Sequence, residues 1–385
     1  MKKKRTFWIF SIVYVLLFTV SYIWLPYLYA YESYTFLVPR LALITGISIF
    51  AFLTGLNTSL APNVALTKKM PINFDMACYI TFFIFILVVI VTFATASRIP
   101  IIESLKGASS EDLSIYREDF LKARQGWEAS LNYILGAICG GILPYLIAIA
   151  FYRNHRYKFF YALIFLFYSI SFLEKAYFFK IAIPVFFIYF YNAKNKSLFV
   201  IKGLGIIVLM VVAMYTLAGP SNSDANTANF FSIRYIPSGT WDSITYRSVV
   251  VPIVTTLDSL RVFAENFKER LFYGTTSSFV ALITGQNSFN FDRFVYQFQF
   301  GGSETGASNA TYLIESFINF GYTGVAVFAF VVGKLMRLVI REKDIAAISV
   351  LPLFILNLYS ASLIGTLLSG GFIFFFIMVR FFKFK

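Results

Sequence analysis

Runs of about 20 apolar residues recur along nearly the whole chain, and each could cross the roughly 30 Å hydrocarbon core of a bilayer as a helix. Inside lipid a spanning segment must satisfy its own backbone hydrogen bonds, which favours helices over open sheets. Of the 385 residues, 58% are hydrophobic and only 14% are charged, whereas about a quarter of the residues in a soluble domain are charged. The sequence therefore excludes a soluble enzyme, a secreted disulfide scaffold and a nucleic-acid-binding protein, and predicts an all-α polytopic membrane helix bundle.

The length and spacing of these runs predict about ten membrane helices within a single membrane domain, 1–385. The expected spans are 7–25, 36–56, 75–95, 131–152, 159–173, 176–191, 198–218, 316–339, 345–362 and 364–380. Two connecting segments, 96–130 and 219–315, are long enough to carry structure of their own.

Alternate connecting segments are strongly basic. Segments 1–6, 68–69, 153–158, 194–202, 334–343 and 380–385 hold 19 of the 33 Lys and Arg, with three acidic residues on the same side. Lys and Arg concentrate on the cytoplasmic side of membrane proteins. We therefore expect both termini in the cytoplasm and both long segments, 96–130 and 219–315, on the outer face. The net charge of +14 is then a topology signal.

Both outer segments show local periodicity. Residues 110–123 predict a short amphipathic helix on the membrane surface, and Leu257, Leu260 and Phe263 begin a second helix of this kind over 257–271. Within 287–300, aromatic residues occupy alternate positions from Phe294 to Phe300, which favours a strand or extended segment.

Little in the composition supports metal or disulfide chemistry. Cys78 and Cys139 fall inside apolar runs, and His155 is the single histidine. The outer segments have no D-x-D pattern and no carboxylates at metal-ligand spacing. We expect neither a metal nor another cofactor.

Two arginines of the long segment lack a local counter-ion. Arg234 has no acidic residue within seven positions, and Arg247 has none at helical spacing. A guanidinium of this kind suits a phosphate or diphosphate, which it can bind with two parallel hydrogen bonds; contact with lipid headgroups is the alternative. Arg261 differs, because Asp258 and Glu265 at i−3 and i+4 predict an ion pair on a helix surface.

Further candidates lie near the outer helix ends. Arg40, Lys175 and Lys180 are cations there, although Lys175 could simply pair with Glu174 in the hairpin. Tyr235, Trp241 and Tyr246 could offer aromatic faces to sugar rings, or they could have a structural role alone. Asp242 and Glu315 are the acidic residues that could act as a catalytic base. Glu315 stands in an apolar context, where loss of water favours a carboxyl that exchanges a proton; the alternative is an acid at a helix N-terminus.

The segment 308–325, SNATYLIESFINFGYTGV, contains Asn309 and Glu315 and resembles the helix entry of Wzy-type O-antigen and capsular polysaccharide polymerases. The layout is similar as well, with a large outer segment before the last three helices and a basic residue, Lys175, after a tight hairpin. Lys175 stands where an arginine is usual, and the R-x(10)-G pattern of some members is absent.

The resemblance implies a GT-C-like glycosyltransferase of lipopolysaccharide or capsule biosynthesis in the bacterial cytoplasmic membrane. Such enzymes join oligosaccharide repeat units carried on undecaprenyl diphosphate at the periplasmic face. Family arginines of the outer segment map onto Arg247 and, less directly, Arg234. The implied partners are the lipid-linked oligosaccharide, membrane lipid, a chain-length regulator and a flippase, with no nucleic acid.

Elementary chemistry agrees with this reaction, since positioned cations can stabilise a diphosphate leaving group and a carboxylate can take the acceptor proton. Our hypothesis places Arg247, Arg234, Lys175 and Lys180 at the diphosphate, and Glu315 or Asp242 near the acceptor. A lipid-linked oligosaccharide flippase or transporter and a membrane scaffold remain alternatives. An O-antigen ligase-like enzyme is the nearest alternative, but it relies on an outer-segment histidine, and His155 lies in a segment expected in the cytoplasm.

Overall fold

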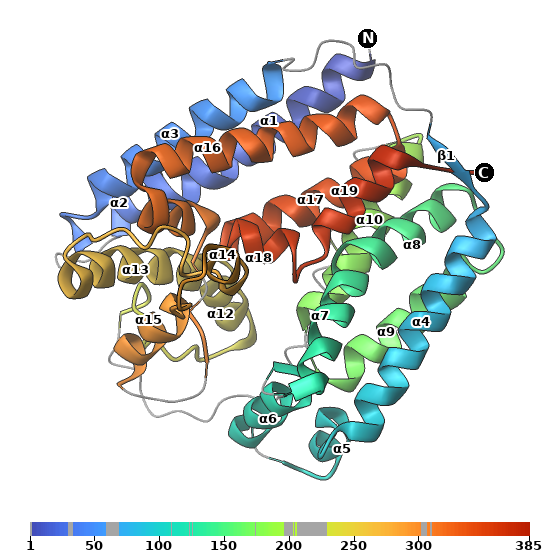
Figure 1. Ribbon diagram of the computed structural model, residues 1–385, viewed down its shortest axis with the longest axis horizontal. Coiled ribbons are helices and arrows are strands. Elements are labelled where there is room, and N and C mark those ends of the chain that lie inside the picture. The colour runs from blue at the N-terminus through green and yellow to red at the C-terminus, as the bar shows by residue number, and fades with distance from the viewer. Residues whose placement is uncertain are drawn as a thin grey trace. The chain divides into compact units, whose positions relative to one another are not determined.

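A computed structural model describes residues 2–29, 34–58, 69–108, 110–122, 124, 126–173, 175–195, 203, 205, 229–301, 306–308 and 310–385. This part of the chain is mostly helical, with one two-stranded sheet (Figure 1). The prediction of a helical fold is confirmed.

Among the described residues, five helices are long and apolar enough to cross a membrane: Ile9–Tyr29, Val38–Asn57, Phe74–Thr95, Gly126–Tyr152 and Tyr312–Glu342. Shorter apolar helices cover Lys158–Ser171, Tyr177–Asn192, Ile345–Ser360 and Phe372–Phe381. Eight of the predicted spans coincide with these helices, and most of the span expected at 198–218 lies outside the described residues. The span expected at 364–380 is not a single helix, because it is divided between Leu363–Leu367 and Phe372–Phe381. The prediction of about ten crossings therefore stays a prediction.

The chain divides into two compact units. The first comprises Met1–Leu60, Pro220–Ile340 and Ile355–Gly365, and the second comprises Ala61–Gly219, Arg341–Phe354 and Thr366–Lys385. Both combine segments far apart in the sequence. The helices α17 (Ile345–Ser360) and α18 (Leu363–Leu367) each contribute residues to both units.

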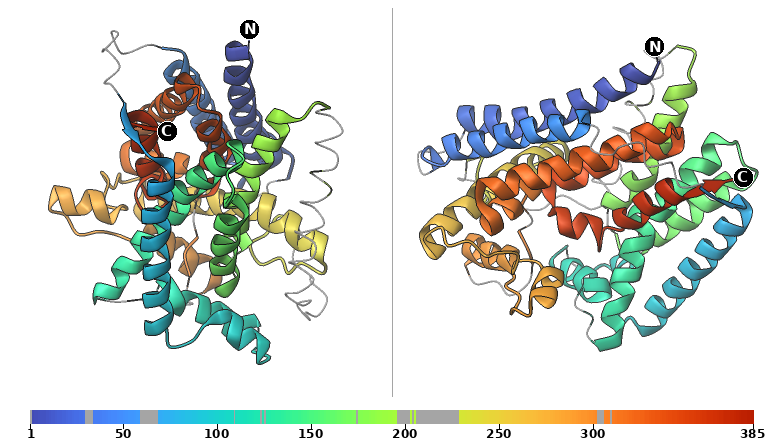
Figure 2. Two further views of the ribbon diagram at one scale, coloured as in Figure 1. Left: turned by 90° about the vertical axis from the view of Figure 1, so that its right-hand side faces the viewer. Right: turned by 45° about the horizontal axis from the view of Figure 1, so that its top comes forward.

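In the first unit, α1 (Lys2–Thr19), α3 (Val38–Asn57) and α16 (Tyr312–Glu342) run side by side (Figures 1 and 2). The π-helix η1 (Val20–Trp24) and α2 (Leu25–Tyr29) continue α1. Glycines allow the close approach of α3 to α16, because a Cβ on Gly55 would lie 2.2 Å from the carbonyl oxygen of Phe330. Gly333 similarly meets Phe52. Gly333 is therefore also a position of close helix packing.

Helix α16 is interrupted at Gly321, whose φ of 65° is costly for other residues. The interruption frees carbonyl groups at the end of the first helical part. The N–H groups of Phe272 and Tyr273 donate to the carbonyls of Ile318 and Asn319, at 3.0 and 3.1 Å. The chain near residue 272 therefore caps the break in α16.

The segment before α16 folds into five short helices: α12 (Thr240–Thr245), η6 (Tyr246–Val250), α13 (Val251–Phe267), α14 (Ser278–Thr284) and α15 (Phe291–Phe300). The helix expected at 257–271 is present as α13. Its position is not the expected one, because Thr255, Thr256, Asp258 and Ser259 are buried together with the apolar residues. Helix α13 is a core helix of the first unit rather than a surface helix.

The strand expected within 287–300 is wrong, since this segment forms α15. The Asn290 side chain accepts the N–H of Arg293 at 3.0 Å and caps the helix start, and Gly301, at φ 71°, ends it. Phe291, Val295 and Gln299 are buried at a spacing of four. The helical period of these residues overrides the alternation of the aromatic rings, which are half-buried at Phe294 and Tyr296 and exposed at Phe298 and Phe300.

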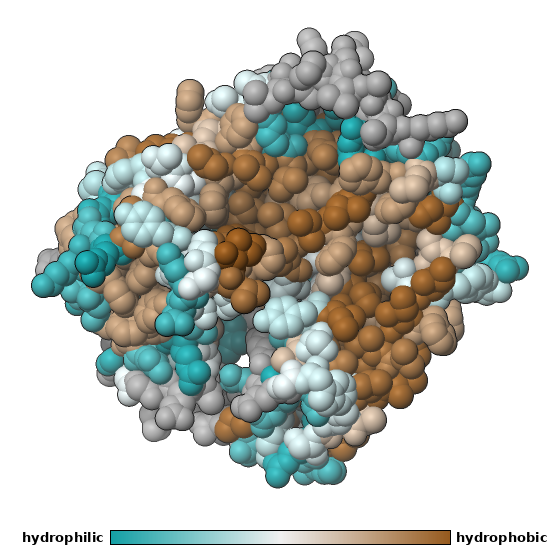
Figure 3. Space-filling view, in the orientation of Figure 1, coloured by the Kyte–Doolittle hydropathy of each residue, from teal (hydrophilic) through white to brown (hydrophobic). Residues whose placement is uncertain are grey.

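The second unit contains α4 (Phe74–Thr95), α5 (Pro100–Leu105), α6 (Ser110–Arg117), η3 (Glu118–Lys122), η4 (Gly126–Glu128), α7 (Ala129–Ala137), η5 (Ile138–Ile142), α8 (Leu143–Tyr152), α9 (Lys158–Ser171), α10 (Lys175–Asn192) and α19 (Phe372–Phe381). Strands β1 (Met70–Ile72) and β2 (Phe382–Phe384) pair in parallel. Apolar side chains cover the visible face of α4 (Figure 3); its exposed residues include Phe83, Leu87 and Ile90. Lipid would satisfy such a surface.

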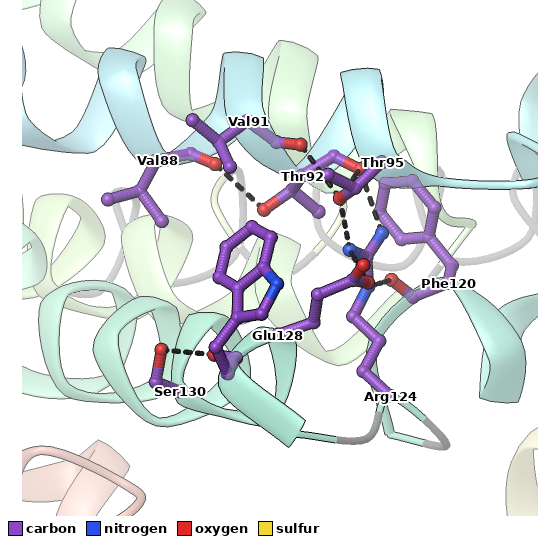
Figure 4. A network of polar contacts seen from close by, with 9 residues as sticks. Val88, Val91, Thr92, Thr95, Phe120, Arg124, Glu128 and Ser130 are labelled. Atoms are coloured by element: carbon purple, nitrogen blue, oxygen red, sulfur yellow. Dashed lines mark hydrogen bonds and ion pairs between the residues drawn. The ribbon is translucent and has the colours of Figure 1, made fainter.

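The helix expected at 110–123 is present as α6 and η3. Arg124 follows it and has a side chain only 4% exposed. Its guanidinium donates to the carbonyls of Phe120 and Thr92, at 2.7 and 2.8 Å, to the Thr95 hydroxyl, and to Glu128 at 3.0 Å (Figure 4). Because a buried guanidinium needs such partners, Arg124 fixes this segment to the end of α4.

Candidate functional site

Two adjoining cavities, both widely open to the surface, lie in the first unit, and Arg234 is an exposed residue between them. One has a volume of about 440 Å³ and the other about 290 Å³, and Ile233, Arg234 and Gln299 line both. Pockets that hold small ligands usually measure about 300–1,000 Å³. Arg234, predicted from its missing counter-ion, therefore stands where the two cavities meet.

Arg234 lies in a turn that packs against aromatic rings. The N–H of Tyr235 donates to the Ser232 carbonyl at 3.1 Å, and the Tyr246 hydroxyl donates to the same carbonyl at 2.8 Å. Tyr246 is 6% exposed and forms a small core with Val250 and Val254, against which Tyr235 also packs. Both tyrosines, expected as sugar-binding faces, are thus in contact with the protein itself.

Asp242 holds the start of α12. Its carboxylate accepts hydrogen bonds from the Tyr235 hydroxyl and the Ser238 N–H, each at 2.8 Å. The hydrogen bond with Asp242 raises the pKa of Tyr235. These contacts give Asp242 a structural task, and its predicted role as a base stays untested.

Asp258 is a site residue that was not predicted from the sequence. This residue is 2% exposed, yet it lines the smaller cavity together with Arg234 and Arg261. The Gln299 amide donates to its Oδ2 at 2.6 Å, and the Tyr34 hydroxyl donates to Oδ1. Burial raises the pKa of Asp258, while the hydrogen bonds from Tyr34 and Gln299, and then the Arg261 charge, oppose the rise.

Arg261 takes part in this site as well. Its Nε donates to Glu265 Oε1 at 2.8 Å, so the predicted ion pair is confirmed. The guanidinium also lies 5.6 Å from the centre of the Phe298 ring, and Arg261 lines the smaller cavity. Pairing with Glu265 does not remove Arg261 from the cavity wall.

Other predicted residues of the first unit lie apart from the cavity walls. Arg247 is exposed on η6 and Trp241 is 56% exposed on α12, and neither lines either cavity. Arg40 forms an ion pair with Glu269 at 2.7 Å. Glu315 is inside α16, where its Oε2 accepts the N–H of Leu363 at 2.6 Å. The two cavities thus gather Arg234 and Tyr235 from the predicted set.

The remaining predicted residues cannot be joined to this site. Lys175 begins α10 and Lys180 lies on the same helix, with its Nζ 3.4 Å from the centre of the Tyr177 ring. Both belong to the second unit, so their grouping with the arginines stays a prediction. Asn309 and Glu174 lie outside the described residues.

The chemistry of the site follows from its donors and acceptors. Arg234 can bind an anion with two hydrogen bonds. Asp258 and the neighbouring amide and phenol can bind hydroxyl groups. Among the described residues, no three His, Cys, Asp or Glu come together as metal ligands would. Comparisons of the chain with protein-family models, curated proteins and solved structures found no match.

Proposed function

We propose that this protein is a membrane glycosyltransferase that joins undecaprenyl-diphosphate-linked oligosaccharide repeat units into a polysaccharide. The observation that carries the proposal is the position of Arg234, a cation without a local acid, in the shared wall of two ligand-sized cavities. The resemblance of residues 308–325 to Wzy-type polymerases supplies the substrate class.

A cation at this place suits the leaving group. When a sugar–diphosphate bond breaks, negative charge builds on the diphosphate oxygen, and a positioned guanidinium stabilises that charge. Arg234 takes this role in the proposal, and Arg247 is its companion from the same segment. Lys175 and Lys180 complete the predicted binding groups.

In this proposal the chemistry takes place at the outer face of the bacterial cytoplasmic membrane, with both termini inside, and the charge pattern of the chain supports that orientation. In that orientation a flippase delivers the repeat units and a chain-length regulator limits their number. Five helices long enough to cross a membrane support the membrane location.

Arg234→Ala tests the proposal in a strain that lacks the chromosomal gene. Complementation with the unaltered chain should restore a ladder of lipid-linked glycans on a gel, and Arg234→Ala should leave single repeat units, because the diphosphate loses its partner. Arg270→Ala is the matched control, since Arg270 belongs to the same segment and lines neither cavity; it should restore the ladder.

Three results would contradict the proposal. A full ladder from Arg234→Ala at equal protein level would remove Arg234 from the reaction. Single units trapped inside the gene-deletion strain would identify a flippase instead, whereas finished polymer left on its lipid carrier would identify a ligase.

A further inference from the structure

The smaller cavity contains a buried carboxylate with capacity to bind a ligand. Each Asp258 oxygen accepts one hydrogen bond, from Tyr34 or from Gln299, and a carboxylate oxygen has two acceptor positions. Gln299 is itself fixed, because its Oε1 accepts a hydrogen bond from the Ser308 hydroxyl. The network therefore orients Asp258 and leaves one acceptor position on each oxygen.

The Asp258 carboxylate lies beside the ion pair between Arg261 and Glu265 without being part of it. In the part of the chain that the structure describes, Arg261 forms its ion pair with Glu265, at 2.8 Å, rather than with Asp258. Arg261 is near enough for its charge to favour the ionised form of Asp258, yet burial of a carboxylate still costs several kcal/mol of desolvation in general.

We propose that the smaller cavity binds the acceptor sugar and that Asp258 takes the proton of its attacking hydroxyl. This inference rests on the proposed function and assigns the donor's diphosphate to Arg234 and the acceptor to the cavity between Asp258 and Phe298. The acceptor oxygen bonds to the donor sugar carbon C1 as the bond from C1 to the diphosphate oxygen breaks. The electron pair of that bond stays on the diphosphate, and the hydroxyl proton moves to Asp258, which later releases it to water.

The wall of the cavity suits a sugar. Phe231 and Phe298 supply apolar ring faces, while Gln299 and Arg261 carry N–H donors. Most of the lining side chains are polar, which suits a ligand with many hydroxyl groups. Arg234, which borders both cavities, would lie between the acceptor and the diphosphate.

Asp258→Asn tests the role, because it keeps the side-chain shape and removes the base. Purified full-length protein in lipid nanodiscs is given synthetic undecaprenyl-diphosphate-linked repeat units, and both polymer formation and substrate binding are measured. We expect Asp258→Asn to lose at least about 100-fold in turnover, as removal of a general base does, with substrate binding changed by less than about threefold (under 0.7 kcal/mol). Glu269→Gln is the matched control, since it removes an exposed carboxylate of the same unit that lines neither cavity; it should keep near-normal turnover.

The outcomes separate the two proposals. If the unaltered protein forms no polymer from these units, the proposed function fails, and the role of Asp258 fails with it. If the unaltered protein forms polymer and Asp258→Asn does so at the same rate, the role of Asp258 alone is overturned. Equal loss of binding and turnover in a folded Asp258→Asn protein would also overturn it, because that result describes a binding group and not a base.

Discussion

Asp258 and Asp292 are two carboxyl groups of the first unit with different surroundings. Asp258 is held by an amide and a phenol and faces a cavity. Burial raises the pKa of Asp292, which lies on α15, to about 6. A carboxyl without compensating hydrogen bonds favours its neutral form, so Asp292 is a cost to stability near neutral pH.

This cost predicts a pH-dependent stability. The folded-state pKa of Asp292 lies above the unfolded value, so the folded protein binds more protons, and stability falls as pH rises from about 4 to about 6. Asp292→Asn removes this loss and should raise the free energy of unfolding at pH 7.5 by at most about 3 kcal/mol, with little effect at pH 4. Thermal unfolding in detergent at both pH values measures the difference. A gain of equal size at both pH values would contradict the argument.

Of the residues that line the cavities, Arg234 could be predicted from the sequence and Asp258 could not. Arg234 was found because an arginine without a local acid is visible in the sequence. Asp258 was missed because Arg261, three residues on, suggested an ordinary surface ion pair. The available signal was its position after ten uncharged residues, 248–257; only the contacts from Tyr34 and Gln299, distant in sequence, reveal its setting.

Among the helices, the contact between α3 and α16 depends on glycine. Gly55→Ala would place a methyl group 2.2 Å from a backbone oxygen of α16, so backbone must shift. Overpacking of this kind costs about 1–3 kcal/mol, and the protein should unfold at a lower temperature. Gly46→Ala on the same helix is the control, because no atom lies within 4 Å of its added Cβ. Equal unfolding temperatures for the two variants would show that α3 does not pack this way.

The helices were predictable where an apolar run was long, as for α3, α4 and α16. The helical periodicity of α15 was not recognised, because aromatic rings at alternate positions masked the buried residues spaced by four. The break of α16 at Gly321 could not be predicted from the sequence either. Its φ of 65° occurs where N–H groups of residues 272 and 273 cap the preceding helical part. Short elements take their form from neighbours that local sequence does not specify.

At the scale of the whole molecule, each unit is assembled from distant segments. In the second unit, β2 pairs with β1, and the carbonyl of Phe384 accepts a hydrogen bond from Arg153 at 2.7 Å. Lys69 forms an ion pair with Glu342 at 2.7 Å beside this sheet. Hydrogen bonds and an ion pair therefore join the segments near residues 70, 153, 342 and 384.

Removal of residues 382–385 should loosen the second unit. The truncated chain loses the β1–β2 pairing and the Arg153 contact, and we expect a fall of roughly 2–4 °C in unfolding temperature for each kcal/mol lost. Cys78 and Cys139 are buried in this unit, so faster labelling by a thiol reagent would report the loosening. Lys385→Ala, which keeps the strand backbone, should label at the normal rate. Unchanged labelling of the truncated protein would show that β2 contributes little.

The sequence by itself determined the helical class of this protein, the places of its apolar helices and the arginine that lacks a local counter-ion, because hydrophobic length and local charge spacing are properties of contiguous residues. Tertiary structure decided the cavity at Arg234, the burial of Asp258 and the division into two units. Those features arise from contacts between residues such as Tyr34, Asp258 and Gln299, which are far apart along the chain. Only folding brings such groups within hydrogen-bonding distance.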